Sequence, residues 1–523
     1  MSEATDSAPA EPVATQVDET AGLEDVKQLG FVAALTSLGY VFWVVGGMEM
    51  IERLAFYGVK AVAALYATEA KSTGGLGITM SEFGTVLMVW AFVQTFLPVF
   101  TGGLSDRYGY KESIFVSTVI KITGYLTMAF FPNYTGFFAG ALLLATGTAI
   151  FKPGIQGTLV KSTTRQNSSL AWGIFYQTVN IGGWMGPILA AKLRQTTWQN
   201  VFFACAGIIA LNFIMLLIYK EVGKEERLER NRLAKEGKLK RKSLWKESIE
   251  EILKPHVFVY LLLFSGFWFM FMALFDVLPV HIRDWVDTTD VVATLTNIGL
   301  SGSSAIRFMV GMNEEGTAIQ PEGMVNLNAG IIMITCFFFA YLSGKLRATS
   351  SMVLGCVLST CALFMTGYAT LGWVSLAAIA LFSVGEMMSS PKFSEFIGNF
   401  APSDKKAMYL GFSQIPVGIG WTLEAKIGPW LYEVLASKDA FSRDMLVERG
   451  MGAETAAAIP VGEAFTRLVE FTGESASSLT DALYASHNVA WVWNIMGIIG
   501  IISAIGIWMY GKWILTLNKP SSQ

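Results

Sequence analysis

Residues 31–61 read FVAALTSLGYVFWVVGGMEMIERLAFYGVKA, and this stretch decides what kind of protein the chain can be. The part before Glu49 is apolar or small almost throughout, and about 20 such residues cross the roughly 30 Å of a bilayer core. Glu49, Glu52 and Arg53 then follow, with Lys60 two helical turns further on. A charged side chain at the bilayer centre costs at least about 2.5–3.5 kcal/mol, so these groups must face protein or water. The stretch predicts a membrane-spanning helix with one charged face.

The composition extends this prediction to the whole chain. Of the 523 residues, 53% are hydrophobic and only 15% are charged, against about 25% charged in soluble domains. About twelve apolar segments recur, and we expect an all-α polytopic membrane protein. The segments are 31–67, 82–105, 112–132, 136–160, 170–191 and 200–220, then 255–280, 325–345, 351–369, 372–398, 406–431 and 488–515.

A charged interval divides these segments into six and six. Residues 1–30 are acidic and lack the basic start and short apolar core of a signal peptide, so we expect a disordered cytoplasmic tail. The predicted organisation is 1–30 tail, 31–220 N-terminal six-helix bundle, 221–254 cytoplasmic linker, and 255–517 C-terminal six-helix bundle with an external loop at 432–487.

The distribution of positive charge predicts the orientation in the membrane. The interval is strongly basic at its centre, and the loops DRYGYK, SGKLRATS and APSDKKA lie on the same side if the spans alternate. Short loops rich in Lys and Arg stay in the cytoplasm. The longer loops 284–324 and 432–487 are acidic and lie on the opposite side. We therefore expect a multi-pass protein of the cell (inner or plasma) membrane with both termini cytoplasmic.

The reactive side chains give no sign of catalysis. The four cysteines lie in apolar runs without zinc or disulfide spacing, and the three histidines are far apart. We find no nucleophile–base set, metal set or phosphate loop. The prediction is that the chain is not an enzyme and has no metal and no nucleic-acid partner.

Ionisable residues deep in the apolar segments are the candidates for function, because such groups usually face the bundle interior. They are Glu49, Glu52, Arg53, Lys121, Lys152, Asp276, Glu386, Glu424 and Lys426. Residues three or four apart share a helical face, which joins Glu49, Glu52 and Arg53. A static salt-bridge cluster that locks helices together is one interpretation of this group.

Proton coupling is the other interpretation. Two neighbouring carboxylates cannot both be charged cheaply, so one of Glu49 and Glu52 is expected to bind and release a proton. Arg53 stays charged and can pair either with a glutamate or with the carboxylate of a substrate. A proton on the glutamate would then release the arginine for substrate.

The stretch GGLSDRYGYK resembles the loop motif of the major facilitator superfamily, Gly-x-x-x-Asp-Arg-x-Gly-x-Lys. The resemblance implies two six-helix bundles that rock around a midplane site. It implies a structural and conformational role, and no substrate, for Gly102, Asp106, Arg107, Gly109 and Lys111.

Six further stretches resemble the proton-dependent oligopeptide transporter family, in the right order from span one to span ten. They are EMIERLAFYG, GTAIFKPGIQGTLV, GIFYQTVNIGGWMGP, GFW, NLNAG and FSVGEMMSSP. The resemblance implies a proton-coupled symporter of di- and tripeptides that works by alternating access. It also implies a peptide and protons as ligands and no cofactor besides the proton gradient, and we expect a monomer in the lipid bilayer.

Residue roles follow from the same resemblance. The peptide carboxylate would be held by Arg53 and Lys152, and its amino group by Glu386, Asn180 and Asn328. Tyr57, Lys60 and Trp268 complete the implied substrate site. Proton coupling would rest on Glu49, Glu52, Arg53 and Glu386, together with Asp276 as a substitute for the acidic residue of span seven.

The chain departs from that family at two spans. The acidic position four residues after Trp268 is Met272, and Ser413 stands where span eleven has a Trp. Asp276, or Glu424 with Lys426, could take over the missing charge. Two rival functions stay open: transport of another small zwitterion or organic anion on the same fold, and a membrane sensor or partner protein that does not transport.

Overall fold

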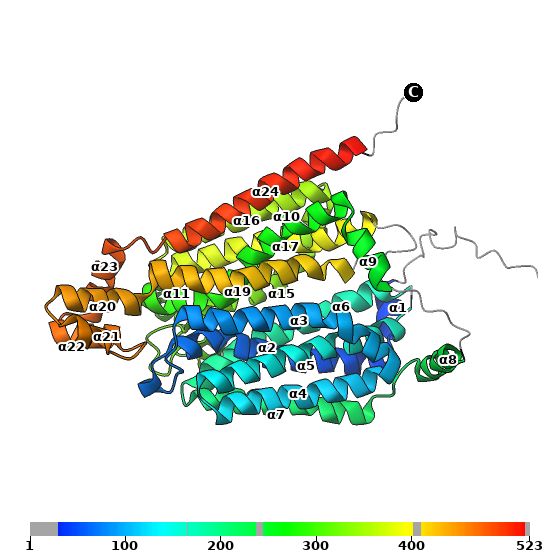
Figure 1. The fold of residues 1–523 in the computed structure, drawn as a ribbon, viewed down its shortest axis with the longest axis horizontal. Coiled ribbons are helices and arrows are strands. Elements are labelled where there is room, and N and C mark those ends of the chain that lie inside the picture. The colour runs from blue at the N-terminus through cyan, green and yellow to red at the C-terminus, as the bar shows by residue number, and fades with distance from the viewer. Residues whose placement is uncertain (1–29, 165, 237–243, 401–408, 410, 518–523) are drawn as a thin grey trace, which may run out of the picture.

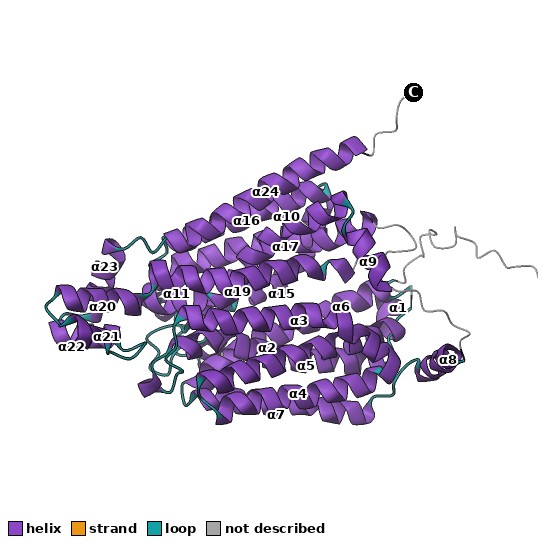
Figure 2. Ribbon diagram, viewed as in Figure 1, coloured by secondary structure: helices purple, strands orange, loops and turns teal. Residues whose placement is uncertain are grey.

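The computed structural model describes residues 30–164, 166–236, 244–400, 409 and 411–517. Regular structure in this part of the chain is helical (Figure 2), apart from two isolated β-bridges, Asp287–Leu371 and Met312–Ile319. Figure 1 shows long helices lying side by side, with short helices gathered at the two ends of the molecule. The all-α prediction is confirmed.

Two sets of six long helices make up the body of the molecule. The first set is α2 (Tyr40–Thr68), α3 (Met80–Tyr108), α4 (Tyr110–Phe130), α5 (Tyr134–Lys161), α6 (Ser168–Arg194) and α7 (Trp198–Ile218). The second set is α10 (Pro255–Asp276), α15 (Leu327–Gly344), α16 (Ala348–Gly367), α17 (Gly372–Phe400), α19 (Gln414–Ala436) and α24 (Trp491–Leu517). We call these sets the N-bundle and the C-bundle.

Eight helices of the described chain are long and apolar enough to cross a membrane, by length and composition. The long helices outside this group are α2, α6, α15 and α19. For α2 the reason is its internal charge, because it carries Glu49, Glu52, Arg53 and Lys60. Candidate functional groups lie on helices outside the group, such as α2, and on helices within it, such as α5 with Lys152 and α17 with Glu386.

Short helices occupy the two ends of the bundles. At one end, the linker end, lie α1 (Phe31–Thr36), α8 (Lys224–Lys235) and α9 (Leu244–Ile252). At the other, the cap end, lie α11 (Leu278–Trp285) and the cap formed by α20 (Lys438–Glu448), α21 (Ala453–Ala457), α22 (Ala464–Thr472) and α23 (Ala476–Ser486) (Figure 1). The connection from α11 to α15 contains α12 (Thr289–Asn297), α13 (Ser304–Met309) and α14 (Pro321–Val325), and η1 (Lys71–Thr73) follows α2.

Two element boundaries differ from the sequence expectation. The first apolar segment is two helices, because Gly39 has an extended backbone and serves as the N-cap of α2. The segment expected to leave the membrane at 432 remains helical to Ala436, because Tyr432 and Ala436 are still buried.

Close helix packing places the charged face of α2 inside the N-bundle. Helix α2 packs chiefly on α6 and α7, and the two bundles meet mainly where α3 faces α19. A Cβ atom on Gly186 of α6 would lie 2.4 Å from the carbonyl oxygen of Leu54 and 2.7 Å from the amide nitrogen of Gly58. Only glycine permits this approach of α6 to α2, as expected for helices that associate inside a membrane.

We predict that Gly186→Ala destabilises the protein. The added methyl group would force α2 and α6 apart, and overpacking of this kind costs about 1–3 kcal/mol. The matched control is Gly207→Ala on α7, where a Cβ would meet nothing within 4 Å. Apparent melting temperatures in detergent should fall for the first variant only, and equal values for both would contradict the packing argument.

Candidate functional site

The first charged cluster centres on Arg53 of α2. Its Nε lies 3.0 Å from Oε1 of Glu49, and its guanidinium also forms an ion pair with Glu52. All three side chains are buried. As their helical spacing predicted, these three residues lie on one face of α2. Both carboxylates contact the guanidinium of Arg53.

Helices α4 and α5 complete this cluster. The ammonium of Lys121 lies 3.3 Å from Oε1 of Glu52 and 3.7 Å from the centre of the Phe151 ring. The hydroxyl of Thr148 donates to the same glutamate oxygen at 3.4 Å. Lys121 therefore pairs with an acidic residue of a neighbouring helix.

Lys152 on α5 is the remaining cation of the first cluster. It interacts electrostatically with Arg53, Glu49 and Glu52, yet no described residue forms an ion pair or hydrogen bond with its ammonium. With two carboxylates against Arg53, Lys121 and Lys152, the ionised cluster carries one excess positive charge. Such a group can accept one further anion.

The second cluster lies in the C-bundle around Glu386 of α17. The amide of Asn328 on α15 donates to Oε2 of Glu386 and to the hydroxyl of Ser383, both at 3.0 Å. Glu386 is 8% exposed, and no cation of the described chain pairs with it. A buried carboxylate without a cation favours a ligand that brings its own positive charge.

Aromatic side chains lie between the two clusters. Tyr57 of α2 interacts electrostatically with Arg53 of the first cluster and with Glu386 of the second, and its ring lies 6.1 Å from that of Phe275. Tyr176 of α6 interacts with both Glu386 and Tyr57. The cationic and anionic clusters therefore belong to different bundles and face the same aromatic group.

Two further residues of the predicted substrate site contact neighbours in their own helices. The amide of Asn180 donates at 3.0 Å to the carbonyl of Tyr176 in its own helix. The ring of Trp268 packs on Phe267 and Phe271, and its buried N–H has no hydrogen-bond partner among the described residues.

A third cluster joins the two bundles toward the cap end. Lys60 of α2 forms a buried ion pair with Asp276 at the end of α10. The indole N–H of Trp421 on α19 donates to the other oxygen of Asp276 at 3.0 Å, and the Trp421 ring lies 4.7 Å from the ammonium of Lys60. Lys60, predicted to contact substrate, thus contacts Asp276 here. Sequence reasoning overlooked Trp421, although it lies three residues before Glu424 and so on the same helical face.

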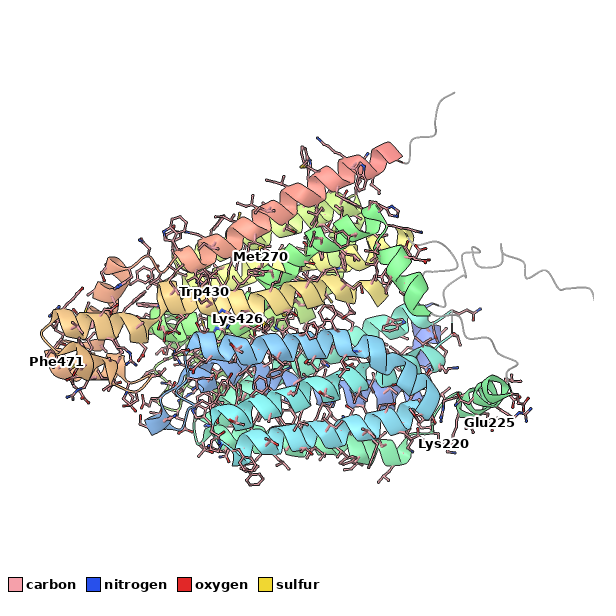
Figure 3. The ribbon with its side chains drawn as sticks, viewed as in Figure 1. Lys220, Glu225, Met270, Lys426, Trp430 and Phe471 are labelled. Carbon is pink, nitrogen blue, oxygen red and sulfur yellow. The ribbon has the colours of Figure 1, made fainter. Side chains whose placement is uncertain are left out.

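Glu424 and Lys426, the two residues of span eleven that could replace the missing acidic group, have different neighbours in the structure. Lys426 lies where α19 faces α3, and it donates to the hydroxyl of Thr85 at 2.8 Å (Figure 3). Glu424 is completely buried and faces Asp276 instead. The two residues therefore do not act as a pair.

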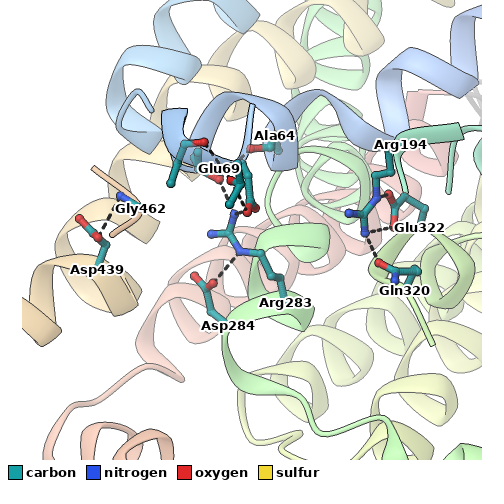
Figure 4. A network of polar contacts seen from close by, with 12 residues as sticks. Ala64, Glu69, Arg194, Arg283, Asp284, Gln320, Glu322, Asp439 and Gly462 are labelled. Carbon is teal, nitrogen blue, oxygen red and sulfur yellow. Dashed lines mark hydrogen bonds and ion pairs between the residues drawn. The ribbon is translucent and has the colours of Figure 1, made fainter. Parts of the chain in front are cut away.

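Further ion pairs join the bundles at the cap end (Figure 4). Arg194 of α6 contacts Glu322 and Gln320, and the guanidinium of Arg283 lies 3.8 Å from Glu69. Together with Lys60–Asp276 and the exposed pair Lys192–Glu314, four ion pairs between described residues connect the N-terminal half of the chain to its C-terminal half. These ion pairs link the two halves of the molecule at this end.

The predicted loop motif connects α3 to α4 at the linker end. Gly109 has φ +124°, a conformation that favours glycine, and Lys111 donates to the carbonyl of Tyr219 at 2.8 Å. Gly102, Asp106 and Arg107 belong to the last turns of α3, and their side chains lie outside the described part of the chain.

Comparison with known proteins agrees with this architecture. The sequence profile of the Major Facilitator Superfamily matches residues 29–423. The chain belongs to this superfamily, whose members are transporters and not enzymes. The sequence prediction of a major facilitator membrane protein is confirmed.

Similarity to peptide transporters, predicted from the sequence motifs, is also found. The solved structure of a POT family transporter in complex with 5-aminolevulinic acid matches with a TM-score of 0.64 and 14% identity, over 90% of this chain and 96% of that one. The peptide transporter YePEPT of Yersinia enterocolitica subsp. palearctica is 28% identical over 180 residues, which span 33% of this chain and only 34% of that relative. The multidrug resistance protein MdtH of Photorhabdus laumondii is 20% identical over 77% of this chain and 89% of its own length.

We predict that Lys60→Met strongly destabilises the protein and that Lys60→Met/Asp276→Leu recovers much of the loss. Removing one partner leaves a buried charge unpaired, at about 3–5 kcal/mol, whereas replacing both by apolar groups is often neutral. Melting temperatures of the wild type, both single variants and the double variant would measure the coupling. Lys192→Met in the exposed pair is the control and should change little; additive effects of Lys60 and Asp276 would contradict the pairing.

Proposed function

We propose that this protein is a proton-coupled symporter of di- and tripeptides that works by alternating access. The observation that carries the proposal is the placement of the charges. An electropositive cluster with an unpaired Lys152 lies in the N-bundle, and an uncompensated Glu386 lies in the C-bundle. A short peptide has a carboxylate and an ammonium at its two ends, so it satisfies both groups at once.

The binding roles follow from these contacts. Lys152, with Arg53 when a glutamate releases it, would hold the carboxylate of the peptide. Glu386, kept in place by Asn328, would hold the ammonium, and Asn180 would join after it leaves the carbonyl of Tyr176. Tyr57 and Trp268 would line the space between the two charges.

Proton coupling would operate through the Arg53 cluster. In the structure Arg53 is occupied by Glu49 and Glu52. A proton on either carboxyl removes one negative charge from the guanidinium and leaves it with capacity for the substrate carboxylate. The protein needs no cofactor for this exchange besides the proton gradient.

The alternating movement would be a rocking of the two bundles. In this cycle the ion pairs at the cap end would hold that end closed, and breaking them would open it. We propose that the cap end is external and that both termini are cytoplasmic, in a cell membrane and with one chain as the working unit. The basic linker and the acidic loop of the cap support this orientation.

Another small zwitterion is a second candidate class of substrate besides the di- and tripeptides. The similar POT family structure holds 5-aminolevulinic acid, and another small zwitterion would satisfy the same two clusters here. Competition by small amino acids, with none by dipeptides, would favour this alternative. Ligand binding without flux would favour a sensor.

We predict that Glu52→Gln abolishes proton-driven accumulation of a labelled dipeptide in proteoliposomes. The amide cannot exchange a proton, so accumulation should fall by about tenfold or more, a change of about 1.4 kcal/mol. Uptake is measured with an inward proton gradient and again after the gradient is collapsed. Glu448→Gln, on the exposed end of α20, is the control, and normal accumulation by Glu52→Gln would refute the coupling role.

We also predict that Lys152→Ala weakens dipeptide transport through the substrate carboxylate. Loss of a charged hydrogen bond costs about 1.5–3 kcal/mol, so the KM for a dipeptide should rise roughly tenfold to a hundredfold. The KM for the corresponding dipeptide amide, which lacks the carboxylate, should barely change. Equal effects on both substrates would place Lys152 outside the carboxylate site.

A further inference from the structure

Glu424 on α19 is a buried carboxylate near the interface of the bundles to which the proposed transport cycle gives no role. Its exposure is 0%, and neither of its carboxyl oxygens has a hydrogen-bond donor among the described residues. Leaving a charged carboxylate in this condition is costly, since burial of an unpaired charge is among the most unfavourable events in folding.

The charged neighbours of Glu424 determine how its negative charge can be balanced. The charged groups that act on it are Asp276 of α10 and Lys60 of α2, and its carboxyl is within hydrogen-bonding reach of Asp276. Lys60 is already paired with Asp276. Two carboxyl groups therefore share one ammonium, and one negative charge remains unless a proton is present.

Among the described residues, no other charged group acts on Glu424. From α3 comes the Trp90 ring, whose centre lies 5.9 Å from the ammonium of Lys60 and whose N–H donates to Gln94 at 2.8 Å. From α24 comes the methyl group of Met496, near Gly428 and Glu424. Trp421 donates its N–H to Asp276 and not to Glu424. A proton between the two carboxyls is the remaining means of satisfying both.

We propose that Glu424 and Asp276 share one transported proton, and that this proton holds the cap end closed. This inference rests on the proposed symport and adds a second proton site to it, on the C-bundle side of the interface. With the proton, Glu424 donates its O–H to Asp276, and the single remaining negative charge balances Lys60. Without it, the excess negative charge is best relieved by water, which favours opening of the cap end.

The first measurement is infrared spectroscopy of the purified protein, because the C=O stretch of a protonated carboxyl is separate from the bands of carboxylates. Compared with the wild type, Glu424→Gln should lose one such band, which in the wild type disappears as the pH is raised. Asp276→Asn should lose it as well, because Glu424 would then become the ionised partner of Lys60. The control is Glu433→Gln on the same helix, whose carboxylate accepts the backbone N–H of Met80 at 2.9 Å.

The outcomes separate this inference from the symport itself. A protonated-carboxyl band that is unchanged in Glu424→Gln would overturn the shared proton, whatever the substrate is. If the band is lost, transport decides its role: Glu424→Gln should retain dipeptide counterflow and lose proton-driven accumulation by about tenfold or more. Accumulation equal to that of the wild type would overturn coupling at this site. Failure of the wild type to accumulate dipeptide would instead refute the proposed function and leave the infrared result standing.

Discussion

The cost of placing charge in a bilayer is the constraint on which the rest of this structure depends. Each charged group deep in a span costs several kcal/mol unless it is paired or reaches water. Arg53, Lys121 and the two glutamates of α2 satisfy one another inside the N-bundle. Glycines on α6 bring that helix close enough to enclose them. The fold is thus arranged around groups that a membrane protein would otherwise avoid.

The same cost explains how the charges can control the relative arrangement of the two bundles. An ion pair within one bundle stabilises that bundle, whereas an ion pair between bundles stabilises one arrangement of the two. Lys60–Asp276 and Arg194–Glu322 are of the second kind, and both lie toward the cap end. Neutralising or competing for one of these groups changes the balance between closed and open. A proton and a small zwitterion are both suited to that task.

Much of the fold could be predicted from the sequence because apolar runs and basic loops are local signals. The number of long helices and their division into six and six followed from patterns within single segments. The helical spacing of Glu49, Glu52 and Arg53 also predicted a shared face. The break at Gly39 and the length of α19 were less accessible, because they depend on backbone geometry and on burial against neighbouring helices.

The sequence by itself determined the fold class and the candidate residues. It indicated a major facilitator protein with a few isolated charges in apolar helices and a resemblance to peptide transporters. The tertiary structure alone decided which charges meet. Lys60 reaches Asp276 across the bundle interface, Lys121 reaches Glu52, and Lys426 turns away from Glu424 to reach Thr85. These partners are between 69 and 341 residues apart in the chain. Helical periodicity says which side of its own helix a residue occupies, but only the packing of the bundles says what lies opposite.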